Sequence, residues 1–188
     1  MNYNAALRSY QMVQSYDTCR CGNVSAQPAG NPQINTVLPE SGVGFATYNR
    51  EEGGVDQVGL PATIQFLIDL GKDWAPHSEV PFQVGDISRE GGGAFPPHDA
   101  HRNGTEADLR PFRLDGAMLP TNINDENYDR DRTRLWVQVV KEKAPGAVVL
   151  FNDPVLIKEG LTKYHKGHGN HLHLRVPQPT DTTSSVSC

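Results

Sequence analysis

The segment HLHLRV at residues 171–176 constrains the fold more than any other part of the chain. Side chains alternate between the two faces of a β-strand, so His171, His173 and Arg175 would share one face. The leucines and the valine between them would share the other face and point into a core. The pattern therefore predicts a strand that presents two imidazoles and one guanidinium from a packed sheet.

Helices and further strands are expected around this strand. Pro61 opens a helix whose apolar residues recur at helical spacing and which ends near Gly71. A second helix is expected to begin at Asp131, as its N-cap, and to stop before Pro145. Two more strands are expected, over 80–88 and 147–152. Strands interleaved with helices predict an α+β domain with a small central antiparallel sheet, flanked by helices and long loops.

The chain of 188 residues is expected to hold one domain with two appendages. Residues 1–58 are expected to form a short N-terminal helix and an irregular arm packed on the domain. Within that arm, residues 22–47 carry one charged residue and seven glycines or prolines, which favours neither helix nor strand. Residues 59–176 would form the core that carries the chemistry, and the polar residues 177–188 a C-terminal tail.

Charge and hydropathy argue against two classes of partner. The 17 Lys and Arg residues against 22 Asp and Glu give a net charge of −5 without a long basic block, so nucleic acid is not expected as a partner. No apolar run approaches the ~20 residues that a membrane span requires. The start of the chain has no cationic segment followed by an apolar one, so no secretory signal peptide is visible.

The histidines gather in two places. Six of the seven lie at 98–101 and 165–173. Histidine is the commonest metal ligand and titrates near neutral pH. Zinc accepts imidazole nitrogen and carboxylate oxygen, and a catalytic zinc usually takes three protein ligands and a water. His101, Asp108 and His173 would make such a set, in a cleft on the sheet.

Two alternatives to this set fit the sequence less well. Glu106 is the rival carboxylate, but it stands one strand step out of phase with its partner. A closed structural zinc usually has four ligands and is rich in cysteine, whereas the three cysteines of this chain lie elsewhere, so an open site is favoured. A disulfide from Cys19 or Cys21 to Cys188 would instead tie the N-terminal arm to the tail.

The sequence resembles the penicillin-insensitive murein endopeptidases, which belong to the lysostaphin, D-Ala-D-Ala metallopeptidase and hedgehog-type zinc group. The two histidine blocks, HDAHRNGTEAD at 98–108 and HGNHLHLR at 168–175, carry the resemblance. Upstream, PATIQFL at 61–67 and VGDISREGGG at 84–93 are similar to the family's leading helix and to its strand with a glycine loop. The resemblance, carried by these four blocks in the same order, extends over roughly residues 59–176.

This resemblance implies a zinc-dependent DD-endopeptidase, a metallopeptidase that hydrolyses the D-Ala–meso-diaminopimelate cross-links of peptidoglycan with a zinc-activated water. Carried over residue by residue, it implies that His101, Asp108 and His173 hold Zn²⁺. His171 matches the histidine beside the metal and His168 the additional active-site histidine. Either of these two could take and return the proton, and the sequence does not divide the role between them.

Four further residues are candidates for the active site. His98 matches a histidine at the edge of the family's site. Asp86 would orient a ligand histidine or cap a turn. Arg89 and Arg175 would bind substrate carboxylates or form ordinary surface salt bridges.

The implied substrate places the protein in the periplasm, or outside the cell as a secreted or delivered enzyme, where a disulfide can persist. Its partners would be peptidoglycan stem peptides and, for an exported effector, an immunity or delivery protein. Two alternatives stay open: a DD- or LD-carboxypeptidase acting on stem peptides, and a non-catalytic zinc-containing binding domain. The presence of both His168 and His171 argues against the binding domain, because a silent metal site needs neither.

Overall fold

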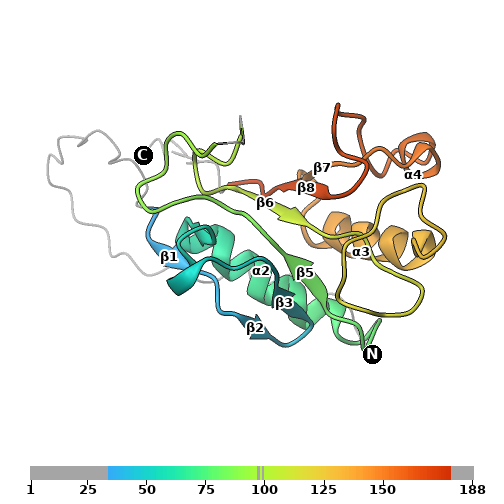
Figure 1. The fold of residues 1–188 in the computed structure, drawn as a ribbon, viewed down its shortest axis with the longest axis horizontal. Coiled ribbons are helices and arrows are strands. Elements are labelled where there is room, and N and C mark those ends of the chain that lie inside the picture. The colour runs from blue at the N-terminus through green and yellow to red at the C-terminus, as the bar shows by residue number, and fades with distance from the viewer. Residues whose placement is uncertain (1–33, 97, 99, 179–188) are drawn as a thin grey trace, which may run out of the picture. The chain divides into compact units, whose positions relative to one another are not determined.

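The computed structural model describes residues 34–96, 98 and 100–178 of the chain. The expected N-terminal helix, the three cysteines and most of the C-terminal tail lie outside these residues. The described part contains a six-stranded sheet, a two-stranded sheet and three α-helices (Figure 1). The expected α+β class is confirmed. Among the described residues, no helix has the length and apolar character needed to cross a membrane.

The six-stranded sheet carries the candidate site. Its strands, in spatial order, are β2 (Ser41–Gly42), β3 (Phe45–Thr47), β5 (Phe82–Val84), β6 (Glu106–Leu109), β8 (Leu172–Arg175) and β7 (Val148–Leu150). Neighbours pair antiparallel except β3 and β5, which are parallel. The sheet is therefore mixed, and the expectation of a purely antiparallel sheet is wrong. The connection between β3 and β5 includes a helix, as parallel neighbours require.

Part of the expected irregular arm belongs to the sheets. Strand β1 (Thr36–Val37) pairs with β4 (Val58–Gly59) to form the second sheet, β2 and β3 join the first, and a 3₁₀ turn covers Glu52–Gly54. Phe45 is buried and stacks on Phe82, with ring centroids 6.1 Å apart. Gly44 has a φ of 73° and lies against the main chain of Gly71, where a side chain would collide. The glycines of this segment therefore allow close packing on a helix.

Two helices cover one face of the sheet. They are α2 (Pro61–Trp74) and α3 (Arg130–Lys143), which pack together. Pro61 at the first position of α2 confirms the predicted start. The predicted N-cap of α3 is wrong by two residues, because Asp129 accepts the hydrogen bond from the Arg132 N–H at 2.9 Å. Asp131 instead lies exposed in the first turn.

The core between the helices and the sheet leaves the other sheet face for chemistry. Trp74 of α2, Trp136 of α3 and Leu172 and Leu174 of β8 are all buried in one apolar cluster. The residues that alternate with these leucines therefore point away from the helices. The predicted division of the strand at 171–176 into an apolar face and a histidine face is confirmed for β8.

A short third helix, α4 (Pro154–Lys158), was not expected from the sequence. Its N-cap, Asp153, accepts the Val155 N–H at 2.8 Å, and Pro154 takes the first helical position. The Asp153 carboxylate is fully buried and also accepts the Tyr128 hydroxyl at 2.8 Å and Arg130 Nε at 2.7 Å. Burial raises the pKa of Asp153, but these hydrogen bonds outweigh burial and hold that pKa below its usual value.

Replacing Asp153 by alanine should lower the free energy of unfolding at pH 7 by about 3 kcal/mol, the low end of the range for a broken buried pair, because Arg130 can still reach water. Since the pKa is lowered by folding, the contribution is present above the pKa of the unfolded chain and is lost as pH falls through the folded value. Urea unfolding at several pH values measures both effects. Asp131→Ala, at an exposed ion pair, is the control and should cost under about 1 kcal/mol. Equal losses in the two variants would contradict the prediction.

Candidate metal centre

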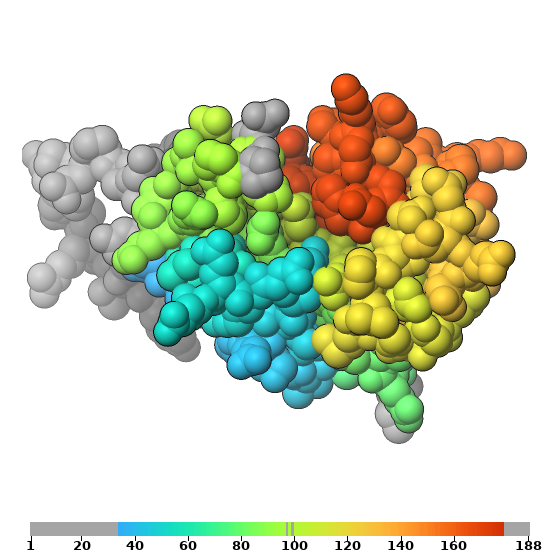
Figure 2. Space-filling model, viewed as in Figure 1, coloured from blue at the N-terminus to red at the C-terminus, as the bar shows by residue number. Residues whose placement is uncertain are grey.

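A cleft of about 550 Å³ opens on the sheet face opposite α2 and α3. Figure 2 shows the segments before β6 and before β8, coloured green and red, on either side of a hollow. Seven of the residues singled out from the sequence line it: His98, His101, Asp108, His168, His171, His173 and Arg175. The structure therefore brings both histidine clusters to one site.

Strand register places the first pair of functional side chains. In the β6–β8 pair, Asp108 lies opposite His173 and Glu106 lies opposite Arg175. Asp108 and Glu106 are two residues apart on one strand, so both carboxylates face the cleft. Glu106 is one pair out of register with His173, as expected, but it lies on the same face as Asp108 and contacts His173 all the same. Its carboxylate lies 3.5 Å from His173 Nε2 and accepts Arg175 Nε at 2.8 Å.

His101 reaches the site from a loop held in an unusual conformation. Its φ is 61°, a left-handed value that few residues with a side chain adopt. The His101 N–H donates to Glu106 Oε2 at 2.7 Å, and His101 Nδ1 lies 3.0 Å from the Ile87 carbonyl oxygen. These two contacts hold the ring, which is 1% exposed, with its Nε2 pointing at Asp108.

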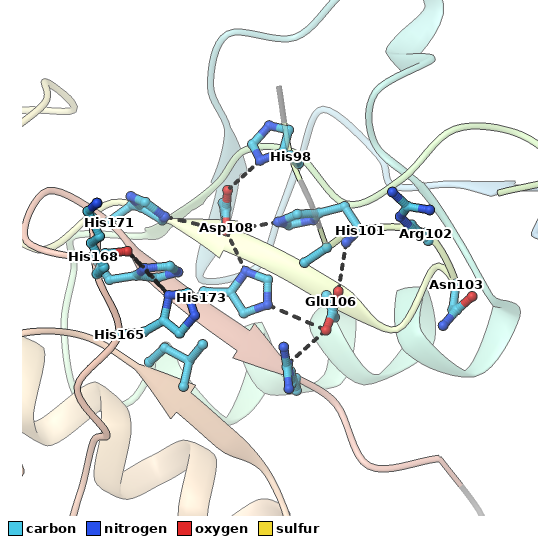
Figure 3. Close-up of a pocket in the computed structure, with 15 residues that line it drawn as sticks. His98, His101, Arg102, Asn103, Glu106, Asp108, His165, His168, His171 and His173 are labelled. Carbon is cyan, nitrogen blue, oxygen red and sulfur yellow. Dashed lines mark hydrogen bonds and ion pairs between the residues drawn. The ribbon is translucent and has the colours of Figure 1, made fainter. Parts of the chain in front are cut away.

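Four imidazoles turn a nitrogen toward the Asp108 carboxylate (Figure 3). His173 Nδ1 and His101 Nε2 lie 3.0 and 3.1 Å from Oδ1. His98 Nδ1 lies 3.8 Å from Oδ2, and His171 Nε2 lies 3.9 Å from Oδ1. The carboxylate is thus the common neighbour of all four rings.

The outer nitrogen of each ring faces an oxygen atom. The partners are Asp86 Oδ2 for His98 at 2.7 Å, the Ile87 carbonyl for His101 at 3.0 Å, Asn170 Oδ1 for His171 at 2.8 Å and Glu106 Oε1 for His173 at 3.5 Å. Metal-bound histidines usually have such an oxygen partner for the nitrogen that does not bind the metal. Asp86 is therefore positioned to orient a histidine. That histidine is His98, which is not one of the ligands expected from the sequence.

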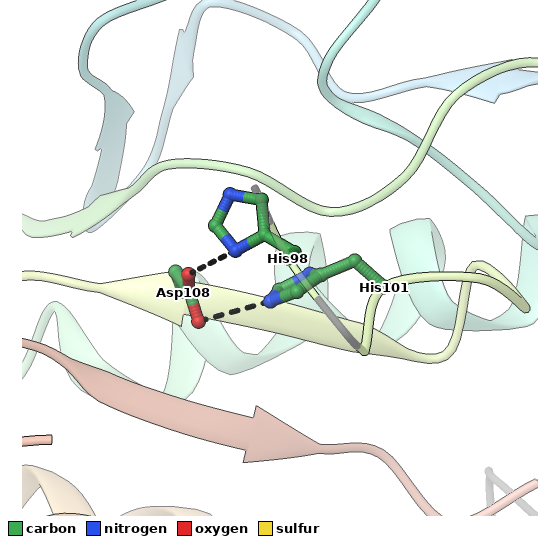
Figure 4. Close-up of side chains that lie close together, drawn as sticks. All are labelled: His98, His101 and Asp108. Atoms are coloured by element: carbon green, nitrogen blue, oxygen red, sulfur yellow. Dashed lines mark ion pairs between the residues drawn. The ribbon is translucent and has the colours of Figure 1, made fainter. Parts of the chain in front are cut away.

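Three of these residues satisfy the geometry of a metal site directly. One ligand atom from each of His98, His101 and Asp108 lies within 4.8 Å of the other two, so the group could hold a metal ion (Figure 4). This group shares His101 and Asp108 with the ligand set expected from the sequence and contains His98 in place of His173. Two imidazoles and a carboxylate suit zinc and related transition metals.

The charges at the centre are strongly coupled. Burial raises the pKa of Asp108, but hydrogen bonds from His101 and His173 outweigh burial and hold that pKa well below its usual value. Burial lowers the pKa of His173, yet Asp108 and Glu106 raise it to about 9. The hydrogen bond with His173 in turn lowers the pKa of Glu106 to about 2. Without a metal, His173 is therefore protonated at neutral pH, and metal binding has to displace that proton.

His168 and His171 differ from His173 in their charge. Burial lowers the pKa of both imidazoles, and neighbouring histidines lower it further. Both are therefore neutral near pH 7. The centroid of the His168 ring lies 4.5 Å from that of His171 and 5.6 Å from that of His173. Two neutral bases, His168 and His171, thus lie beside the centre, as expected from the sequence.

The structure separates the two arginines singled out from the sequence. Arg175 lines the cleft and is half exposed. Arg89 does not line the cleft. Its guanidinium instead lies over the Phe95 ring, 4.7 Å from the ring centroid. Sequence reasoning missed the contacts of Glu106, which the period of two from Asp108 could have indicated. It also missed the cleft-lining Arg102, for which the sequence offers no signal.

No protein-family model matches the chain, and no curated protein sequence matches it.

Proposed function

We propose that this chain is a zinc metallopeptidase that hydrolyses the D-Ala–meso-diaminopimelate cross-links of peptidoglycan. The observation that carries the proposal is the convergence of four imidazoles on one buried carboxylate at the wall of an open cleft. A structural zinc site is closed by four protein ligands, whereas an open cleft leaves room for a substrate. The choice of peptidoglycan as substrate is supported by the resemblance of the two histidine blocks.

The distances to the Asp108 carboxylate, together with the resemblance, support His101, Asp108 and His173 as the zinc ligands. The ring nitrogens of both histidines lie 3.0–3.1 Å from the same carboxylate oxygen. His98 is farther away, with its Nδ1 3.8 Å from the other oxygen. His173 Nε2 lies 3.5 Å from Glu106 Oε1, the kind of oxygen partner expected for a ring that binds metal through Nδ1. When bound there, zinc would supply an activated water and polarise the scissile carbonyl.

His171 and His168 are the residues proposed to move protons. Both are neutral, line the cleft and lie beside the centre without belonging to the ligand set. Asn170 Oδ1 lies 2.8 Å from His171 Nδ1, which holds that ring with Nε2 turned toward Asp108. A neutral imidazole in this place can take a proton from the attacking water and return it to the leaving amine.

The cations of the cleft suit a peptide that carries carboxylates. Arg102, Lys166 and Arg175 line it together with the histidines. Half of the Arg175 side chain is exposed while its Nε holds Glu106, so the rest of the guanidinium can meet a substrate. The proposed substrate also implies action in the periplasm or at a target cell envelope.

Digestion of purified cross-linked sacculi tests the proposal. The zinc-loaded protein should convert dimeric muropeptides into monomers, as measured by chromatography and mass spectrometry, and the Asp108→Ala variant should not. A carboxypeptidase would shorten stem peptides and leave the dimers intact. Binding to sacculi without any change in the muropeptides would mean that the site holds a metal for recognition alone, and would refute the proposed reaction.

A further inference from the structure

The turn that carries His165 and His168 has a geometry that the peptidase proposal does not use. The His168 N–H donates to the His165 carbonyl at 3.2 Å, which closes a β-turn. Gly167, the third residue of the turn, has a φ of 88°, the value of a type II turn, which glycine adopts without strain. In this conformation the carbonyl of Lys166, the second residue, lies against both imidazoles.

Three electron-rich atoms of this turn form a nearly equilateral triangle. His165 Nδ1 lies 3.2 Å from His168 Nδ1 and 3.2 Å from the Lys166 carbonyl oxygen, and His168 Nδ1 lies 3.1 Å from that oxygen. Ligand atoms bound tetrahedrally to zinc at 2.0–2.1 Å stand about 3.3 Å from one another. The triangle therefore has nearly the dimensions of one face of a metal coordination shell.

Asn152, a residue outside the turn, helps to fix it. Asn152 accepts the His165 N–H through its Oδ1 at 3.0 Å, and its own N–H donates to the His168 carbonyl at 2.8 Å. Asn152 thus holds both ends of the turn. The two imidazole planes stand at 85° to each other, which allows both Nδ1 atoms to face a common point. The arrangement needs little reorganisation to bind an ion.

We propose that His165 Nδ1, His168 Nδ1 and the Lys166 carbonyl oxygen form a second metal site at the mouth of the cleft. Two imidazole nitrogens and one carbonyl oxygen suit zinc, nickel or copper in the divalent state. His165 is exposed, so water can fill the remaining positions. Because the site has no anionic ligand, it binds more weakly than the Asp108 centre. The proposal does not rest on the peptidase activity.

A metal-free turn can satisfy the same distances in another way. If each Nδ1 carries a proton, both N–H groups can donate to the Lys166 carbonyl, which has two lone pairs. Metal binding then moves each proton to Nε2 and leaves both imidazoles neutral, so that His168 cannot act as a base while this site is loaded and proton transfer falls to His171. The two explanations differ in a measurable property, namely whether added zinc is bound in a way that depends on His165.

Zinc titration of the full chain against a chromophoric chelator tests the site. The wild type should bind two equivalents of zinc, a tighter one at the Asp108 centre and a weaker one at the turn. His165→Ala should lose the weaker equivalent and keep the tighter one. The Asp108→Ala variant should show the reverse, losing the tighter equivalent and keeping the His165-dependent one. His77→Ala, which removes an exposed histidine far from the turn in sequence, is the control and should lose neither.

These variants keep the proposal separate from the assignment at Asp108. Equal zinc binding by the wild type and His165→Ala would overturn the second site, whatever happens at Asp108. Nitrogen-15 spectra of the histidine rings provide an independent measurement, because ligation through Nδ1 leaves the proton on Nε2 of His165 and His168. Rings that keep a proton on Nδ1 in excess zinc would also overturn the proposal.

Discussion

Asp108→Ala should lose the zinc of the central site, with affinity falling by more than 100-fold, and should release no detectable monomers from cross-linked muropeptides. Asp108 is the only carboxylate in the proposed ligand set, and all four imidazoles of the centre approach it. Residues that merely orient a ligand typically contribute 10–100-fold to metal affinity, so the loss of a ligand should exceed that range. Metal analysis after dialysis and competition with a chelator measure the change.

The flanking histidines provide the matched comparison. His101→Ala and His173→Ala should behave like Asp108→Ala, whereas His98→Ala should retain zinc with at most the 10–100-fold loss of an orienting residue. The opposite order, with zinc retained in His173→Ala and lost in His98→Ala, would replace His173 by His98 in the ligand set. Full zinc content at the central site of Asp108→Ala would show that Asp108 is not a zinc ligand.

His171→Ala should keep the central zinc near the wild-type level and lower the turnover of muropeptide dimers by about 10²–10⁴-fold, the usual effect of removing an acid–base group. The reason is its position: His171 Nε2 is 3.9 Å from Asp108 Oδ1, beyond the 3.0 and 3.1 Å of the proposed ligand histidines. Burial lowers the pKa of His171, so the ring is available as a base at neutral pH. Steady-state rates and zinc content are measured on the same preparation.

The His168→Ala variant tests whether His168 and His171 share the proton transfer. If both rings act on protons, His168→Ala should also slow turnover, and the double variant should lose less than the product of the two single effects. Loss of the central zinc in His171→Ala would make His171 a ligand. Unchanged turnover in that variant would leave His171 as a residue that only packs beside the metal.

Local patterns predicted the elements that depend on neighbouring residues in the sequence. The start of α2 at Pro61 and the two faces of β8 were correct because helix caps and strand alternation are local properties. The parallel pairing of β3 with β5 was not predicted, since it depends on contacts such as Phe45 with Phe82, far apart in the sequence. Helix α4 was missed because five residues carry almost no periodic signal.

The sequence predicted which residues form the candidate site better than it predicted the contacts between them. The spacing of the histidines indicated that His101, Asp108 and His173 would meet, and they do. It did not indicate that Glu106 would contact His173, or that His98 would come within 3.8 Å of Asp108. Those contacts depend on strand register and on a loop with a left-handed residue, which only the folded chain defines.

The pairing of β6 with β8 also sets the order of events during folding. Asp108 and His173, which meet across this pair, are 65 positions apart in the sequence. Closing so long a loop costs conformational entropy before the contacts between the strands can stabilise it. The pairing of β6 with β8 is therefore expected to form late. A growing polypeptide has no complete centre until β8 is synthesised, and zinc can stabilise the chain only after the two strands have met. Refolding rates should therefore be nearly independent of zinc, and unfolding rates should fall as zinc is added.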